Sequence, residues 1–211
     1  MKLHIYEHCP FCVRARMIFG IKKFPVELSV MSEADADTPT RMVGKKIAPI
    51  LEKDDGTFMA ESMDIVHYVD ELGGDTFLNG TGNAEIDRWC ETATATLFRL
   101  VIPRFIRAEF AEIRTPASRE AYVQRERRAF GDLDKLMLET HALLQNMNAR
   151  LDALETLLVN RQEINESDFR LYPLLRSLTI VKDIRFGPNT RIYIDFMSAL
   201  TGVNNLFNQA Q

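Results

Sequence analysis

Cysteine is scarce in this sequence, which has three, Cys9, Cys12 and Cys90, among 211 residues. An odd and small number of cysteines does not suit an extracellular disulfide framework. Long apolar runs are also missing, since no stretch approaches the ~20 residues that a membrane-spanning helix needs. The N-terminus lacks the apolar segment of about 7–15 residues that marks a signal peptide. The sequence therefore predicts a cytoplasmic protein with no membrane partner.

An excess of positive charge is missing too. The formal net charge is −4 and the isoelectric point is near 5.6. Binding to nucleic-acid phosphates needs clustered Lys and Arg, so we expect no nucleic-acid partner. Apolar residues make up 46% and charged residues 27%, as in ordinary globular proteins. The length allows one large domain or two small ones.

The first third of the chain alternates between strand and helix patterns. A strand, a helix and a second strand in succession imply a parallel strand pair with a right-handed crossover. An Asp-Asp-Gly turn further on predicts a hairpin, which adds an antiparallel pair. The expected fold is an α/β domain with a mixed four-stranded sheet. Its predicted strands cover 3–6, 26–30, 49–51 and 57–59, and its helices cover 10–23, 38–43 and 62–72.

Helical periodicity dominates the remainder of the chain. The most glycine-rich stretch lies at 73–84 and predicts a linker. Apolar residues at helical spacing predict one long amphipathic helix over 133–158. Cys90 follows Trp89 in another apolar helical stripe, which is typical of buried core residues. We therefore predict an α/β domain at 1–72, a linker at 73–84 and an all-helical domain at 85–211.

The chemistry of the sequence centres on Cys9-Pro10-Phe11-Cys12, directly after the first predicted strand. Pro10 suits the first position of a helix, where no N–H is needed. Cys9 then becomes the N-cap residue, where free backbone N–H groups and the helix dipole stabilise a thiolate. Cys12 follows almost one turn later, close enough to form a disulfide with Cys9. The pattern predicts a redox pair, in which Cys9 attacks a disulfide and Cys12 or a free thiol resolves the mixed species.

Two other interpretations of the pair are weaker. A zinc site would need two further ligands, and no second close pair of Cys or His residues exists in the sequence. A structural disulfide across two intervening residues would close too short a loop to stabilise the fold much. We therefore predict no metal, and we treat His8, which precedes Cys9, as at most a modulator of that cysteine.

Several motifs of this sequence together resemble a known family. The cysteine motif, Ala48-Pro49-Ile50-Leu51 and Glu61-Ser62 at a helix start resemble the thioredoxin-like domain of glutaredoxins and glutathione transferases. The wider segments 12–20, 38–44, 61–70 and 172–178 look like the bacterial glutaredoxin 2 family. That family joins a glutaredoxin domain to an all-helical, transferase-like domain. The resemblance covers nearly the whole chain and is patchier between 110 and 165.

The resemblance implies roles for particular residues. It implies that Cys9 is the nucleophile and Cys12 the second cysteine of a redox-active disulfide. It implies that Pro49 is a cis-proline beside the active site and that the Ala48 backbone pairs with the cysteine part of glutathione. Glu61 and Ser62 are implied to hold the γ-glutamyl end. A helix N-terminus at Ser62 suits a carboxylate, although a plain capping role for Ser62 is compatible with the same sequence.

Two details of the predicted site stay open. The commonest glutaredoxin motif has Tyr where this chain has Phe11, so the apolar ring remains and any role of the hydroxyl is lost. Arg41, Lys45 and Lys46 face either the glycine carboxylate of glutathione or only solvent.

The predicted function is a glutathione-dependent thiol-disulfide oxidoreductase. Its expected substrates are protein disulfides and protein–glutathione mixed disulfides, with glutathione as the co-substrate. A glutathione transferase is one alternative, but transferases use Tyr, Ser or a lone Cys and need no second cysteine. A non-enzymatic interaction protein on the same scaffold is another, and it needs no cysteine pair either. The resemblance implies a monomer.

Overall fold

A computed structural model describes residues 1–72, 74–78, 80–159, 161 and 163–211. The chain divides into two compact units. The first contains residues 1–78, 109–125 and 201–203, and the second contains residues 79–108, 126–200 and 204–211. The predicted division at a linker of residues 73–84 stays a prediction, and Gly73 and Asn79 of that linker lie outside the described residues.

The first unit is built on a mixed four-stranded sheet with the strand order β2-β1-β3-β4. The strand β1 (Lys2–Ile5) pairs in parallel with β2 (Glu27–Val30) and antiparallel with β3 (Ile50–Glu52). The short strand β4 (Phe58–Met59) completes a hairpin with β3. The parallel pair and the hairpin that the sequence predicts are therefore both confirmed.

The strand β2 shows how an edge position changes burial. Its side chains alternate apolar and polar, yet Leu28 and Val30 are both exposed. An edge strand pairs on one side only, so its apolar side chains gain less cover than those of β1. On β1, by contrast, Leu3 and Ile5 are fully buried.

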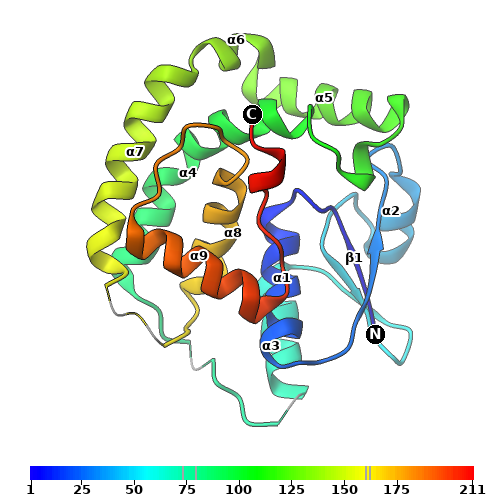
Figure 1. The fold of residues 1–211 in the computed structure, drawn as a ribbon. Helices are drawn as coiled ribbons and strands as arrows, with labels where there is room; N and C mark the ends of the chain where they lie inside the picture. The colour runs from blue at the N-terminus through cyan, green and yellow to red at the C-terminus, as the bar shows by residue number, and fades with distance from the viewer. Residues whose placement is uncertain (73, 79, 160, 162) are drawn as a thin grey trace. The chain divides into compact units, whose positions relative to one another are not determined.

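Two helices of the first unit pack against each other, α1 (Pro10–Ile21) and α3 (Ser62–Leu72) (Figure 1). Just after α1, the buried Lys22 ammonium lies 3.1 Å from the carboxylate of Asp70, a buried residue of α3. The backbone N–H groups of Phe77 and Leu78 also donate to Asp70. The short helix α2 (Asp37–Val43) ends at Gly44, which has a positive φ that suits a residue without a side chain.

The first unit also contains residues far along the chain. The 3₁₀-helix η1 (Ala111–Ile113) and most of α5 (Pro116–Phe130) belong to it. The backbone N–H of Glu33 donates to the carbonyl of Glu112 at 2.9 Å, and the N–H of Ala111 donates to the carboxylate of Glu7 at 2.8 Å. The sequence contained no sign of this arrangement.

Helices joined by turns and loops make up the second unit, and its described residues contain no strand. Its core brings together apolar side chains of α4 with those of α6, α7 and α8. Trp89 and Cys90 are buried, as predicted, and the indole N–H of Trp89 donates to the carbonyl of Arg150 at 2.7 Å. Its helices are α4 (Ala84–Phe105), α6 (Leu133–Leu138), α7 (Thr140–Leu157), α8 (Asp168–Leu178) and α9 (Pro188–Thr201), with the 3₁₀-helix η2 (Phe207–Gln209) near the C-terminus.

The prediction of one helix over 133–158 is wrong. The structure has two helices there, α6 and α7, which meet at Glu139. The N–H of Glu139 turns back to the carbonyls of Leu136 and Met137, and the Thr140 hydroxyl donates to the carbonyl of Met137. These bonds satisfy carbonyls at the end of α6, so the helix stops although the apolar spacing continues.

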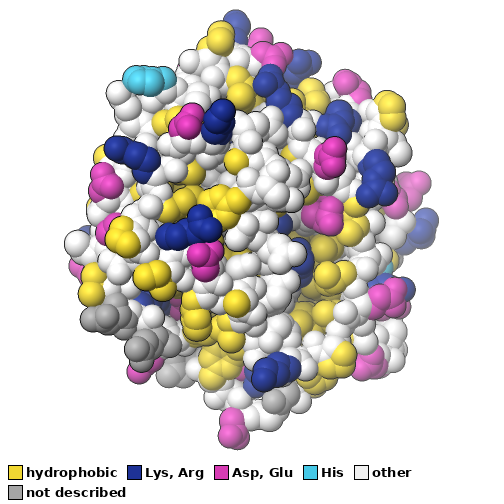
Figure 2. Space-filling model, in the orientation of Figure 1, with side chains coloured by type: hydrophobic (Ala, Val, Ile, Leu, Met, Phe, Trp, Pro, Cys, Tyr) yellow, Lys and Arg dark blue, Asp and Glu magenta, His cyan; other side chains and the backbone are white. Residues whose placement is uncertain are grey.

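Charges of both signs are interspersed on the face of the molecule that Figure 2 draws. On the face drawn in Figure 2, Lys and Arg side chains alternate with Asp and Glu, and neither sign forms a continuous patch. Among the described residues, no helix is both long and apolar enough to cross a membrane.

Candidate active site

The cysteine motif lies where β1 ends and α1 begins. Pro10 is the first residue of α1, and Cys9 is its N-cap residue with extended backbone angles. The backbone N–H of Cys12 donates to the Cys9 sulfur at 3.4 Å. Cys9 is partly exposed, whereas Cys12 is buried, and both thiols are free. The N-cap geometry expected from Cys9-Pro10 is therefore confirmed.

The two thiols differ sharply in acidity. A hydrogen bond from the Cys12 thiol lowers the pKa of Cys9 to about 7, assisted by the positive charge of His8 and by backbone N–H groups. Burial raises the pKa of Cys12 well above its usual range, and its hydrogen bond to Cys9 raises it further. A large fraction of Cys9 is thus thiolate at neutral pH while Cys12 keeps its proton. This difference suits Cys9 as the attacking sulfur.

A cleft of about 270 Å³ adjoins the motif in the first unit. Its volume is near the lower end of the ~300–1,000 Å³ common for small-molecule sites. The Ala48–Pro49 peptide bond, at its wall, is cis. The cleft is lined by Phe11, Ile47, Ala48, Pro49, Glu61 and Ser62. It therefore brings together every residue predicted to hold glutathione, together with Phe11 of the cysteine motif.

Polar groups stand at one end of this cleft. Ser62 is the first residue of α3, and Glu61 precedes it with a φ of 68°. The Arg14 guanidinium donates to the Ser62 hydroxyl oxygen at 3.2 Å and lies 5.3 Å from the centre of the Phe11 ring. The sequence analysis missed Arg14, although it lies three residues after Phe11 on α1, a spacing that puts two side chains on one helix face.

The three basic residues near the cleft have different partners. Lys45 lies 3.3 Å from the Glu61 carboxylate, and both side chains are largely exposed. Lys46 turns instead to the backbone carbonyl and carboxylate of Glu33. Arg41 donates to the hydroxyl of Thr38. Of these three, only Lys45 contacts a residue that lines the cleft.

Tyr6, the tyrosine nearest the motif in sequence, is buried at the end of β1. Burial raises the pKa of its hydroxyl far above the ordinary value, and the charge of Glu33 acts in the same direction. Tyr6 is also not among the residues that line the cleft, so its hydroxyl is not placed to activate a thiol bound there. Tyr6 therefore packs, as the sequence analysis predicted.

A second cluster of ionisable groups adjoins Cys9, and sequence reasoning did not find it. The buried ring of His8 lies 2.7 Å from the carboxylate of Glu112, and Glu33 and Arg125 lie beside it. Glu112 follows His8 by 104 residues, so no local spacing could have indicated the pair. Within the described parts of the chain, no group of three or more His, Cys, Asp or Glu side chains is arranged to hold a metal ion.

Comparisons with known proteins agree with this geometry. Residues 3–76 match the family described as glutathione S-transferase, N-terminal domain, and residues 85–210 match glutaredoxin 2, C terminal domain. Glutaredoxin 2 of Escherichia coli (strain K12) is 44% identical over 214 residues, which cover 100% of both chains.

Solved structures show the same relationship. The crystal structure of glutaredoxin 2 from Salmonella typhimurium in complex with glutathione superposes with a TM-score of 0.96 at 42% identity. It covers 100% of this chain and 98% of that one. Gtt2 from Saccharomyces cerevisiae, at 17% identity and a TM-score of 0.62 over 97% of this chain and 100% of its own, shares the fold alone. The full-length match and the family match over residues 85–210 show that this chain belongs to the glutaredoxin 2 family.

Proposed function

We propose that this glutaredoxin reduces protein disulfides and protein–glutathione mixed disulfides through Cys9 and Cys12, with glutathione as the reductant. The observation that carries the proposal is the partly exposed Cys9 sulfur at the N-terminus of α1, with its pKa lowered to about 7. The cleft that begins at Phe11 supports it, since a small-molecule site of about 270 Å³ adjoins the cysteine motif.

The first step is attack by the Cys9 thiolate on one sulfur of the substrate disulfide. A new S–S bond forms to Cys9, the old S–S bond breaks, and the other sulfur leaves with the electron pair as a thiolate. With a glutathionylated protein, attack on the glutathione sulfur releases the protein thiol and leaves glutathione on Cys9.

The second step regenerates the nucleophile by one of two routes. A glutathione thiolate can attack the sulfur of glutathione held on Cys9, which releases oxidised glutathione and the Cys9 thiolate. With a protein disulfide, Cys12 loses its proton and attacks Cys9, the substrate leaves as a dithiol, and two glutathione molecules then reduce the Cys9–Cys12 disulfide. Each route carries two electrons from glutathione to the substrate.

Glutathione fits the cleft by the chemistry of its ends. The positive end of the α3 dipole and the Arg14 guanidinium suit the γ-glutamyl carboxylate, and the Glu61 carboxylate suits the ammonium group. The Ala48 backbone can pair with the cysteine portion, which brings the glutathione sulfur toward Cys9. The Salmonella relative, whose structure is a complex with glutathione, supports glutathione as the ligand.

The first experiment is mass spectrometry of the intact chain and its peptides after incubation with oxidised glutathione. The proposal predicts a glutathione adduct on Cys9 or a Cys9–Cys12 disulfide, either of which reduced glutathione removes. Cys9→Ser should abolish exchange, while Cys12→Ser should keep turnover on glutathione mixed disulfides and lose dithiol reduction. Cys90→Ser, which removes a buried thiol of α4, is the matched control and should behave like the unchanged chain.

Exchange is favoured over conjugation of glutathione to electrophiles by the placement of the groups in the site. Tyr6 is buried and is not among the residues that line the cleft, so its hydroxyl is not placed to activate a thiol bound there, whereas Cys9 has the lowered pKa. Conjugation activity that survives Cys9→Ser would overturn the exchange proposal. A monomeric state and a cytoplasmic location stay predictions of the sequence, and a reducing compartment suits a cysteine pair of this kind.

A further inference from the structure

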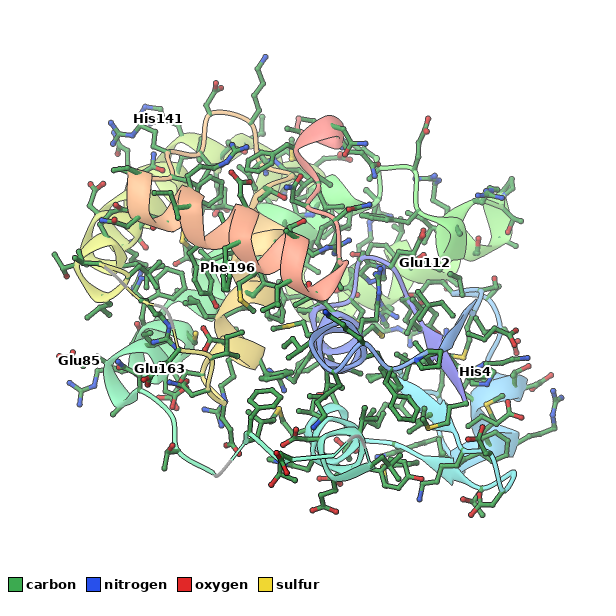
Figure 3. All side chains as sticks on the ribbon, turned by 60° about the horizontal axis from the view of Figure 1, so that its bottom comes forward. His4, Glu85, Glu112, His141, Glu163 and Phe196 are labelled. Atoms are coloured by element: carbon green, nitrogen blue, oxygen red, sulfur yellow. The ribbon has the colours of Figure 1, made fainter. Side chains whose placement is uncertain are left out.

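His8 precedes Cys9, and its side chain is buried against a segment from the middle of the chain. Its backbone N–H donates to Oε1 of Glu112 at 2.9 Å, and its ring Nδ1 lies 2.7 Å from the same oxygen. Glu112 belongs to η1, and Figure 3 labels it beside the blue ribbon of the N-terminal residues. Two bonds to one buried oxygen fix the position of His8 relative to η1.

The other ring nitrogen of His8 faces a second buried carboxylate. Nε2 lies 3.9 Å from Oε1 of Glu33, whose side chain is fully buried. The other oxygen of Glu33 accepts from the Arg125 guanidinium at 2.6 Å and lies 3.6 Å from the Lys46 ammonium. His8 therefore lies between two carboxylates that come from different parts of the chain.

Aromatic rings enclose this cluster. The Tyr6 ring is stacked with the His8 ring at 6.0 Å between centroids, and the Tyr122 ring stands edge-on at 5.0 Å. Phe110 lies 5.9 Å away at a tilt. Charges attract one another more strongly in such low-dielectric surroundings than in water, and an uncompensated charge there is costly.

Charge balance in the cluster depends on His8. Arg125 and Lys46 compensate Glu33, whereas the charged partner of Glu112 is His8. Oε2 of Glu112 accepts no hydrogen bond from any residue that the structure describes. Burial alone would raise the pKa of Glu112, but the hydrogen bonds and positive charge of His8 outweigh burial and lower it.

The geometry of the His8 ring also favours a positive charge on this residue. A neutral imidazole has one N–H and can donate toward one carboxylate, whereas an imidazolium has two and can donate toward both. The carboxylates of Glu112 and Glu33 stand on opposite ring nitrogens. Nε2 is too far from Glu33 for a hydrogen bond, so this second carboxylate favours the imidazolium by charge attraction across 3.9 Å, while Nδ1 bonds to Glu112.

We propose that Glu112, assisted by Glu33, keeps His8 positively charged beside Cys9, so that η1 and α5 help to set the reactivity of the nucleophile. In this arrangement His8 and Glu112 are positioning residues, because neither needs to touch the substrate. The inference rests on the proposed function, in which Cys9 is the attacking sulfur.

The arrangement acts on the two cysteines in opposite directions. The positive charge of His8 lowers the pKa of Cys9, and the negative charge of Glu112 raises the pKa of Cys12. Both effects keep the thiolate on Cys9. Among the described residues, Tyr6, Glu33, Lys46, Tyr122 and Arg125 are further ionisable groups of this cluster, and Glu7 accepts from the backbone N–H of Ala111 in η1.

The test is the pH dependence of Cys9 alkylation by iodoacetamide in the reduced full chain, followed by mass spectrometry of the peptide that contains Cys9. His8→Gln removes the charge and keeps a group that can donate to Glu112. We expect it to raise the midpoint pH by about one unit, the size typical of a nearby opposite charge.

Glu112→Gln is the sharper test, because the direction in which it shifts the midpoint pH of Cys9 alkylation separates two explanations. If Glu112 acts through His8, its loss lowers the charge on His8 and the midpoint rises. If Glu112 acts on Cys9 only by its own negative charge, its loss lowers the midpoint. In a His8→Gln background, Glu112→Gln should then raise the midpoint no further. A midpoint that falls or stays unchanged in Glu112→Gln overturns the proposal.

The control is Glu155→Gln in the second unit, where the carboxylate likewise accepts hydrogen bonds, from the backbone of Asn189 and Thr190. It should leave the Cys9 midpoint unchanged. Should Glu112→Gln fail to fold, nitrogen-15 NMR of the unaltered chain decides the matter. Protons on both ring nitrogens of His8 at pH 7 support the proposal, and a proton on one nitrogen only overturns it.

The two proposals fail in different ways. If oxidised glutathione leaves Cys9 of the unaltered chain unmodified, the proposed exchange function is wrong. If Cys9 exchanges with glutathione but its alkylation midpoint is the same with and without His8 and Glu112, only the inference about these positioning residues is wrong.

Discussion

At the scale of single residues, the site depends on the contrast between two sulfurs three positions apart. Cys9 has free N–H groups, a thiol donor and a positive neighbour around it, and Cys12 is buried and accepts from the backbone N–H of Tyr6 at 3.3 Å. The sequence alone predicted the first half of this contrast, because Pro10 at a helix start places Cys9 at the N-cap. The contribution of His8 and Glu112 depends on a contact across the chain, which no local pattern encodes.

The lowered pKa of Cys9 predicts a pH profile. Because the thiolate is the reacting species, the alkylation rate of Cys9 should rise with pH through a midpoint of about 7 and then level off. Cys12→Ala removes the thiol that donates to Cys9 and should raise this midpoint by about one unit. Cys12→Ser should raise it less, since a hydroxyl still donates. Equal midpoints in Cys12→Ala and the unaltered chain would contradict the assigned hydrogen bond.

The pair of Glu61 and Lys45 predicts opposite effects on glutathione. Glu61→Gln removes the group proposed to meet the glutathione ammonium, so the KM for glutathione should rise about two- to fivefold, as suits an exposed ion pair. Lys45→Gln removes a competitor for the same carboxylate, so the KM should fall by a similar factor. Steady-state kinetics at varied glutathione would test both, and shifts in the same direction would argue against this role for Glu61.

At the scale of elements, the sequence predicted the order of strands and helices in the first unit, because each has strong local signals. The Asp-Asp-Gly turn and the proline at the start of α1 mark ends that the structure confirms. The sequence did not predict the break between α6 and α7. There the N–H of Glu139 and the hydroxyl of Thr140 bond to carbonyls at the end of α6, and the helix ends although the apolar spacing continues. The spacing of apolar residues indicates which face of a helix is buried, but it does not indicate where one backbone hydrogen bond of the helix is missing.

The link between α1 and α3 gives a prediction about stability. Asp70→Asn leaves the buried Lys22 ammonium without its carboxylate and weakens the acceptor for Phe77 and Leu78, so the free energy of unfolding should fall by about 3 kcal/mol. The matched control is Asp195→Asn, which breaks an exposed pair with Arg191 and should cost under about 0.5 kcal/mol. Denaturant unfolding of the two variants measures both, and similar losses would contradict the buried role of Asp70.

The packing of α1 gives a second stability prediction, one that opposes helix propensity. Gly20 lies inside α1, where Ala would ordinarily stabilise a helix by about 1 kcal/mol. A Cβ at this position would collide with the backbone of Thr201, which belongs to the same unit. Gly20→Ala should therefore lower the free energy of unfolding by about 1–3 kcal/mol. A more stable Gly20→Ala variant would show that the contact with Thr201 can open at little cost.

At the scale of the whole molecule, the compact units are not continuous in sequence. Composition and a glycine-rich stretch at 73–84 predict where a linker lies, because they depend on neighbouring residues only. They cannot show that residues 109–125 return to the first unit, because that return depends on Glu112 and Arg125 meeting His8 and Glu33. The position of the cysteine motif at the start of α1 was therefore predictable, whereas the charges that surround it were not.

The return of residues 109–125 predicts that residues 1–78 fold poorly when expressed alone. Such a fragment keeps all four strands and both cysteines of the motif, yet it leaves the carboxylates of Glu7 and Glu33 and the ring of His8 without the partners that η1 and α5 supply. Buried polar groups without partners cost free energy, so the fragment should unfold at lower denaturant and less cooperatively than the full chain.

The Cys9 alkylation midpoint of this fragment should also lie above about 7, because the charge on His8 is no longer maintained. Circular dichroism and the alkylation profile together test this. A fragment that unfolds like the full chain, with the same midpoint, would show that the strands and α1 hold the nucleophile without help from the rest of the sequence.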